Sequence, residues 1–472
     1  MTYYSLVFPL FFAAAVLVFW LVPPKAREAV LLAAGVLYMA SWGGVSLGVL
    51  AAVTLLTWAC GRGMAAAGTP AGRRAFLVLG LAVSAGFLFA RKALPLLAPG
   101  VTLVTLTGLA FYALQAASYL ADVYTGRCPV QKNLLRYAVY MSFFPRVLSG
   151  PIGRAEEFFP QLDALRTGQR RCEVAQVRRG LITMLGGWAE KLVLANLLSA
   201  WVNAVYAQWT QCNAPVVLAG GLFFGFSLYF DFAGYSHLAL GAARVLGIEL
   251  APNFRRPYFA QSLGEFWQRW HISLSGWLRD YIYIPLGGSR HGTPRRVLNL
   301  LITFTVSGLW HGSTWQYLFW GLLHGVLQSI GALTRPLRRR FAGKGGPAGV
   351  WARRLFITLC ANGAFLFFGA PSLSQGFGMV GRILSGAPGL GALDLGVSGT
   401  ELAFVLLAMV LAFCLDLAAE RAENAGSSLY DRFAALPGAV RVPVLLVLAV
   451  TVLVFACRLV GTDAASFYYA QF

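Results

Sequence analysis

Long apolar segments separated by short basic loops constrain this chain more than any other feature. Runs such as 180–206 and 218–247 can cross a bilayer, because a helical crossing takes about 20 residues. Hydrophobic residues make up 58% of the 472 residues, and charged residues only 12%, about half the share found in soluble domains. The sequence therefore predicts an all-α polytopic integral membrane protein in a single domain, 1–472. We expect about ten to twelve transmembrane helices, with shorter re-entrant or interfacial helices between them.

The formal net charge of +20 agrees with this class. Arginines in short cytoplasmic loops produce such an excess, so membrane lipid is the expected partner and nucleic acid is not. The same rule places Lys25 and Arg27 in the cytoplasm, and therefore the N-terminus outside. The basic run 166–179 is expected to contact anionic lipid, with an acidic carrier or a cofactor phosphate as the alternative. The seven cysteines form no CxxC pair and no HExxH motif occurs, so no metal site is expected.

The stretch 253–320 combines many aromatic residues with charged ones in an otherwise apolar chain. Its period predicts one helix over 263–283, ended by Pro285 and the Gly287-Gly288 pair. An indole-rich face beside a charged flank is typical of a membrane–water boundary, and the histidine on that face is expected to point away from water. The aromatic face consists of Trp267, Trp270, His271, Leu274, Trp277, Leu278 and Tyr281, and the flank contains Glu265, Gln268, Arg269, Ser275, Arg279 and Asp280.

A second histidine, His311, lies between the apolar runs 297–309 and 315–327, among small residues that include Ser307 and Gly312. An ionisable group at membrane depth is costly and is therefore a functional candidate. Burial keeps an imidazole neutral, and a neutral imidazole can take the proton of an alcohol that attacks a carbonyl. No GxSxG motif supplies a covalent serine. These residues favour His311 as a general base in acyl transfer, with a packing or gating role as the alternative.

Other polar groups interrupt apolar runs. Asp231 and Tyr235 are expected either to join two helices or to shape a cavity. Glu190 and Lys191 are adjacent and so point to different faces, which predicts a separate partner for each. The run 137–148 is too short to cross and is broken at Pro145, which indicates a re-entrant segment beside a cavity.

Several motifs together resemble the membrane-bound O-acyltransferase family, in particular its branch of bacterial alginate O-acetylation proteins, with teichoic-acid D-alanyl transfer proteins as relatives. The resemblance covers most of the chain. Arg146 and Gly369 depart from it, since the family usually has glutamine or histidine at the first position and arginine at the second. The matching motifs are SGPIGRAEEFFPQL at 149–162, YFDFAGYS at 229–236, RWHISLS within 253–288, GLWHGSTWQYLFWGLLHG at 308–325, and an aromatic terminus near Gln471 and Phe472.

The resemblance implies helices around a central tunnel that reaches a histidine. The WHG histidine is His311, which is implied to be catalytic, and the RWHISLS histidine is His271, implied to orient or assist it. Expected substrate or tunnel residues are Trp310, Ser307, Asp231, Tyr235, Trp267, Trp270, Arg279 and Asp280.

The resemblance also implies an activity: transfer of an acyl group, most simply acetyl, from a cytoplasmic thioester to a hydroxyl of a cell-surface polysaccharide or of a partner protein. The donor would be acetyl-CoA or an acyl-carrier phosphopantetheine thioester, with no tightly bound cofactor. An extracytoplasmic acyltransferase- or esterase-like protein is the expected partner, and the bacterial cytoplasmic membrane is the expected location. Two alternatives stay open: D-alanyl transfer from a carrier protein to teichoic acid, and a transporter or polymer-export channel without chemistry.

Overall fold

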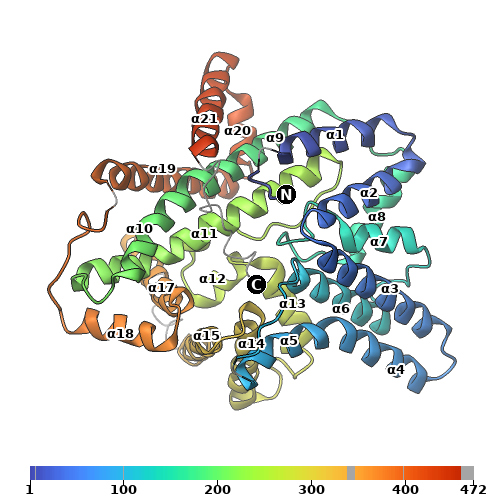
Figure 1. Cartoon of the computed structure of the whole chain (residues 1–472), viewed down its shortest axis with the longest axis horizontal. Helices are drawn as coiled ribbons and strands as arrows, with labels where there is room; N and C mark the ends of the chain where they lie inside the picture. The colour runs from blue at the N-terminus through green and yellow to red at the C-terminus, as the bar shows by residue number, and fades with distance from the viewer. Residues whose placement is uncertain (6, 99, 337–345, 397, 459–472) are drawn as a thin grey trace.

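The computed structural model describes the chain except for residues 6, 99, 337–345, 397 and 459–472. The aromatic terminus at Gln471 and Phe472 lies outside the described residues. The part described consists of helices and connecting loops (Figure 1), so the predicted all-helical class is confirmed. The α-helices are α1 Val7–Leu21, α2 Arg27–Ala40, α3 Gly44–Ala66, α4 Pro70–Leu81, α5 Phe87–Leu97, α6 Leu109–Thr125, α7 Leu134–Ser142, α8 Ala155–Arg166, α9 Val174–Ala189, α10 Asn196–Ala207, α11 Ala214–Val245, α12 Leu263–Arg269, α13 Ile272–Leu278, α14 Gly292–His311, α15 Trp315–Leu333, α17 Gly346–Gly369, α18 Leu373–Leu384, α19 Gly399–Asn424, α20 Leu429–Ala435 and α21 Gly438–Arg458.

Short irregular helical turns join some of these helices. Two are 3₁₀ turns, η1 Pro24–Ala26 and η4 Pro257–Phe259. Three are π-helical: η2 Ala82–Gly86 links α4 to α5, η3 Glu190–Ala195 links α9 to α10, and η5 Arg279–Tyr283 continues α13. Such π-helical turns interrupt the regular backbone bonds and recur near functional sites.

Seven helical stretches among the described residues are long and apolar enough to cross a bilayer. They are α3, the α4–α5 run Pro70–Leu97, the α9–α10 run Val174–Ala207, α11, α17, α19 and α21. Helix α1, with 15 residues, is a shorter apolar helix. The multi-pass membrane class is therefore confirmed, whereas ten to twelve crossings and an outward N-terminus stay predictions.

Helix α11 crosses the centre of the molecule beside α9 and α10 (Figure 1). Helices α9 and α11 approach closely because glycines face each other: a Cβ on Gly234 of α11 would lie 2.7 Å from the carbonyl oxygen of Gly187 on α9. Beside this crossing Lys191 forms a buried ion pair with Asp231. Glu190 Oε2 lies 2.7 Å from His237 Nδ1. The prediction that the adjacent Glu190 and Lys191 have different partners is thereby confirmed.

Helices α14 and α15 form a tight antiparallel hairpin. A Cβ on Gly321 would lie 2.9 Å from the Cα of Gly308, and a Cβ on Gly308 would overlap the Tyr317 carbonyl. The hairpin therefore depends on small residues at its crossing, as in other close helix pairs of membranes.

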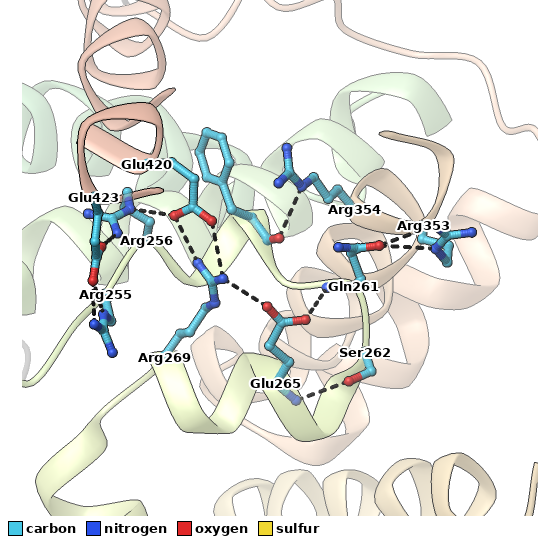
Figure 2. A network of polar contacts seen from close by, with 11 residues as sticks. Arg255, Arg256, Gln261, Ser262, Glu265, Arg269, Arg353, Arg354, Glu420 and Glu423 are labelled. Carbon is cyan, nitrogen blue, oxygen red and sulfur yellow. Dashed lines mark hydrogen bonds and ion pairs between the residues drawn. The ribbon is translucent and has the colours of Figure 1, made fainter. Parts of the chain in front are cut away.

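Helices α19 and α21 expose their apolar surface, because only 6% of the residues in their most apolar windows are buried within the chain. Polar contacts attach the C-terminal end of α19 to the segment 255–269 (Figure 2). Glu420 Oε2 lies 2.6 Å from Arg256 Nε and 3.1 Å from Arg269 Nη1, and Glu423 pairs with Arg255 and Arg256. This attachment leaves the apolar faces of both helices to lipid.

The predicted single helix over 263–283 is wrong. The chain forms α12 and α13, of seven residues each, with a break between Arg269 and Ile272. At the break His271 adopts a left-handed backbone, with φ 43°. Tertiary bonds replace helical bonds there, since the Ile272 amide donates to the carbonyl of Asn253 at 2.8 Å. The periodicity of a local segment contains no information about a hydrogen bond to a distant residue, so the break could not be predicted from it.

The location predicted for the indole face is also wrong. Trp267, Trp270 and Trp277 are 7%, 1% and 5% exposed, so they pack inside the protein and not at a membrane–water boundary. The expectation that His271 points away from water is confirmed, because its side chain is fully buried.

Two irregular segments lie in the N-terminal half. Helix α6 starts at Leu109, after a non-helical stretch at 101–106. The predicted break in the segment 137–148 is confirmed, because α7 ends at Ser142 and turns occupy 144–149, whereas its re-entrant position beside a cavity stays a prediction.

Candidate functional site

The structure brings His271 and His311 together although 39 residues separate them in the chain. Their ring centroids lie 6.3 Å apart, and both side chains are buried. The indole of Trp310 contacts both rings, at 5.6 Å from His271 and 4.7 Å from His311. We refer to His271 and His311 as the histidine pair.

The break between α12 and α13 positions His271. Its left-handed backbone turns the side chain inward against Phe232, with ring centroids 4.6 Å apart. Asn253 holds the following turn, since its side-chain oxygen accepts from the Ser273 hydroxyl at 2.6 Å. The same hydroxyl accepts from the amide of Ile152 at 3.0 Å, which joins the segment after α7 to the site. A non-glycine residue in this conformation is unusual and marks a site that its surroundings determine.

His311 is the last residue of α14. The preceding Trp310 donates its indole N–H to the carbonyl of Ala110 at 2.9 Å, which fixes the helix end against α6. Trp320 and Phe368 contact the His311 ring at 5.0 Å and 5.3 Å. Ser307, one turn earlier on α14, is also buried. The site is thus an aromatic enclosure that contains two imidazoles.

The other predicted site residues divide into two groups. Trp310 contacts both rings of the histidine pair, and Ser307 lies one turn before His311 on α14. Trp267 is one ring further away, because it contacts Trp320 at 5.9 Å and Trp320 contacts His311. Trp270 packs against Phe365 in the adjoining aromatic core, at 4.9 Å.

The remaining predicted residues lie in contacts of their own. Asp231 is paired with Lys191, and Tyr235 packs on Tyr3 with ring centroids 5.0 Å apart. Asp280 lies 2.8 Å from Arg279 and 3.0 Å from Arg154, in an ion-pair cluster on η5. These contacts support the helices that surround the histidine pair.

Sequence reasoning gave no role to His324, which lies on α15 one turn after Trp320 and is fully buried. Its ring contacts Trp320 at 5.0 Å and Trp267 at 5.1 Å. The sequence offered one signal for this residue: His324 follows Trp320 by one helical turn, so both side chains lie on the same face of α15.

The two departures from the family pattern have structural explanations. Arg146 is buried, stacks over the Phe158 ring at 4.2 Å, and donates to the carbonyl of Tyr140 at 2.9 Å. Its guanidinium therefore holds the turns after α7. At Gly369 a Cβ would lie 2.6 Å from the Phe224 ring, so an arginine has no room there.

Two polar cavities lie at opposite ends of α14. The first, of about 470 Å³, lies at the start of α14 and is lined by Ser262, Leu263, Gly264, Glu265, Gln268, Arg296, Leu300, Gln328, Gly331, Ala332 and Arg335. The second, of about 210 Å³, lies beyond its end and is lined by Leu88, Arg91, Lys92, Pro95, Leu103, Val104, Thr105, Leu106, Leu109 and Ser313. We call them the Arg296 cavity and the Arg91 cavity. Arg296 and His311 are about 22 Å apart along the helix axis, from a rise of 1.5 Å per residue.

Fold and site together define a multi-pass helical membrane protein with a buried histidine pair between two polar cavities. The family model described as MBOAT, membrane-bound O-acyltransferase family, matches residues 129–370, and the chain belongs to this family. That range contains the histidine pair and the whole α14–α15 hairpin.

Known relatives agree with this membership. A protein described as "Probable alginate O-acetylase AlgI" from Pseudomonas fluorescens is 35% identical over 327 residues, 67% of this chain and 64% of the relative. The "Peptidoglycan O-acetyltransferase" of Helicobacter pylori is 30% identical over 311 residues, 61% of this chain and 57% of the relative. The "Teichoic acid D-alanyltransferase" of Bacillus subtilis is 26% identical over 292 residues, 58% of this chain and 71% of the relative. The chain thus spans slightly less than two thirds of the length of its AlgI relative.

Proposed function

We propose that this protein transfers an acyl group, acetyl in the simplest case, from a cytoplasmic thioester to a hydroxyl of a cell-surface polysaccharide or of a partner protein. The observation that carries the proposal is the histidine pair, enclosed in aromatic rings between two polar cavities. Family membership supports the reaction class, and the relatives named for acetylation of alginate and peptidoglycan support acetyl as the group.

In this proposal His311 is the general base. Its neutral ring nitrogen takes the proton of the acceptor hydroxyl while the oxygen attacks the thioester carbonyl. The carbon–sulfur bond then breaks, and the proton passes to the departing thiolate, so that the products are an ester and a free thiol. His271 lies close enough to orient the imidazole or the acceptor, with Trp310 packed against both rings.

The donor is proposed to reach the site from the Arg296 cavity. Basic residues gather at this end of the molecule, namely Arg295, Arg296, Arg335, Arg353 and Arg354. Such a concentration is typical of the cytoplasmic side. Both acetyl-CoA and an acyl-carrier phosphopantetheine thioester are cytoplasmic donors of the required kind.

The acceptor is proposed to approach from the Arg91 cavity, which adjoins the site through Ser313. Arg91 and Lys92 lie about 25 Å along the α4–α5 run from Arg74, which is at its basic cytoplasmic end. Basic residues at the outer end of a span oppose the usual distribution and therefore need an explanation. They favour an acceptor that carries negative charge, such as an acidic polysaccharide. The protein would act in the bacterial cytoplasmic membrane, with an extracytoplasmic partner that receives or passes on the acyl group.

The test is transfer of radiolabelled acetyl in membranes that contain the wild-type protein or the His311→Ala variant. We expect transfer to fall by about 10²- to 10⁴-fold, the usual contribution of a positioned general base. The exposed His291 provides the matched control, since His291→Ala removes an imidazole outside the site. Supplying the donor as acetyl-CoA, as an acetyl-loaded carrier protein or as a D-alanyl-loaded carrier protein identifies the donor class. Equal transfer by wild type and His311→Ala would refute the role of His311.

A further inference from the structure

Among the described residues, two that are not glycine have a left-handed backbone, and both lie in the segment 253–271. They are Arg256, with φ 49°, and His271, with φ 43°. Such a conformation is strained for a residue with a side chain, and it persists only where the surrounding structure holds it. The position of His271 therefore depends on what fixes this segment.

Backbone hydrogen bonds hold the two ends of the segment side by side. The amide of Arg255 donates to the carbonyl of Arg269 at 2.9 Å, and the amide of Ile272 donates to the carbonyl of Asn253 at 2.8 Å. This pairing brings Arg269, two residues before His271, next to the start of the segment.

One carboxylate joins the arginines at the two ends, as Figure 2 shows. Glu420 Oε2 accepts from Arg256 Nε at 2.6 Å and from Arg269 Nη1 at 3.1 Å, and Glu420 Oε1 accepts from Arg269 Nη2 at 3.2 Å. The side chains of Glu420, Arg256 and Arg269 are 13%, 15% and 19% exposed. Water and salt therefore screen these contacts less than they screen an ion pair on the surface.

Two other carboxylates take part in the same network, one at each end of the segment. Glu265 lies 2.8 Å from Arg269 within α12, and Glu423 pairs with Arg256. Without Glu420, both arginines would keep a carboxylate partner. Glu420 therefore adds a bridge between the two ends of the segment, in addition to neutralising charge.

We propose that Glu420 is a positioning residue for His271, which it fixes through Arg256 and Arg269. The inference rests on the proposed function, because it takes His271 to orient the reacting groups. Glu420 lies on α19, outside the residues 129–370 that the family model matches. A helix whose most apolar stretch is almost wholly unburied thus contributes to the geometry of the buried site.

The first experiment measures acetyl transfer by Glu420→Gln, which keeps the length of the side chain and removes its charge. We expect kcat to fall by about three- to tenfold, no further than in His271→Ala, with KM for the donor nearly unchanged. Glu423→Gln is the matched control, because it removes the same charge from the same end of α19 and leaves the bridge in place. Equal losses of kcat in Glu420→Gln and Glu423→Gln would overturn the proposal.

A double-mutant cycle separates positioning of His271 from general support of the fold. In a protein that already carries His271→Ala, Glu420→Gln should change kcat by less than about twofold, because the residue through which it acts is gone. The full loss in both backgrounds would contradict the positioning role. If gel filtration shows that Glu420→Gln folds poorly, Arg269→Lys takes its place in the cycle, since it keeps the charge and loses the two-bond contact with Glu420.

A third measurement needs no acyl transfer. Diethyl pyrocarbonate modifies accessible imidazoles, and mass spectrometry identifies each modified histidine. Modification of His271 should increase several-fold in Glu420→Gln and should stay at the wild-type level in Glu423→Gln. The buried His324 and the exposed His291 serve as internal references, since neither should change between the variants. Equal modification of His271 in wild type and Glu420→Gln would overturn the proposal.

The outcomes separate the two proposals. Wild-type transfer, together with unchanged kcat and unchanged modification of His271 in Glu420→Gln, would overturn the positioning role and leave the acyltransferase intact. Absence of wild-type transfer from every thioester would instead refute the proposed function, and the modification of His271 would still decide whether Glu420 holds that residue in place.

Discussion

At the level of single residues, His271 and His311 share burial among aromatic rings but differ in backbone position. Each ring is buried among aromatic side chains, where a cation is poorly solvated and the neutral imidazole is favoured. The two residues are not equivalent, however. His311 ends α14 beside Ser313 of the Arg91 cavity, whereas His271 sits in a left-handed turn that Asn253 holds. On this difference we base the proposal that His311 transfers the proton and His271 orients it.

His271→Ala should therefore reduce kcat by about tenfold and leave KM for the donor nearly unchanged, because an orienting group acts in the transition state. His311→Ala should cost at least ten times more. Initial rates of acetyl transfer across donor concentrations measure both values, with His291→Ala as the control. A larger loss in His271→Ala than in His311→Ala would require the two roles to be exchanged.

The sequence predicted both histidines, but for different reasons. His311 could be found from the apolar runs on either side, since an ionisable residue at membrane depth stands out in any such sequence. His271 was placed on the correct side of its segment by periodicity, yet the segment is two helices and not one. The break depends on bonds from Asn253, 18 residues earlier, and a local pattern contains no information about them.

At the scale of helices, the site depends on how closely α14 and α15 approach. Gly308 and Gly321 allow the backbones to touch, which places Trp320 and His324 of α15 beside His311 of α14. The apolar character of both helices was visible in the sequence. Which glycines meet could not be predicted, because that depends on the crossing geometry.

Gly308→Ala should destabilise the protein by about 1–3 kcal/mol, the usual cost of overpacking, since the added methyl overlaps the Tyr317 carbonyl. Gly363→Ala on α17 is the matched control, because no atom lies within 4 Å of a Cβ there. Inactivation by heat in detergent, followed over time, compares the two variants. A half-life for Gly308→Ala equal to that of Gly363→Ala would show that the crossing tolerates a methyl group.

At the scale of the whole molecule, cavities lie at both ends of α14, and we propose that donor and acceptor enter them from opposite faces of the membrane. Multi-pass architecture could be predicted from composition, and the break after α7 from Pro145. The cavities could not, because each combines residues from distant elements, such as Arg91 of α5 and Ser313 after α14.

The charge of the Arg91 cavity yields a prediction about the acceptor. Arg91→Gln should raise KM for an acidic polysaccharide several-fold, and added salt should diminish the difference from wild type. A neutral glucan of similar length should show little change, and Arg91→Lys should retain most of the affinity. Arg290→Gln, at an exposed position, is the control. Equal effects on acidic and neutral polymers would show that Arg91 only supports the 101–106 segment, whose Val104 carbonyl it contacts.

Acyl transfer across a sealed membrane is the most direct test of passage from the Arg296 cavity, through the histidine pair, to the Arg91 cavity. Right-side-out vesicles that contain the protein are loaded with radiolabelled acetyl donor, and the acceptor polysaccharide is added outside together with the extracytoplasmic fraction of the source cells. We expect radiolabelled acetyl in the external polymer with wild-type protein and none with His311→Ala. Label that appears only when donor and acceptor share one compartment would contradict the passage from the Arg296 cavity, through the histidine pair, to the Arg91 cavity.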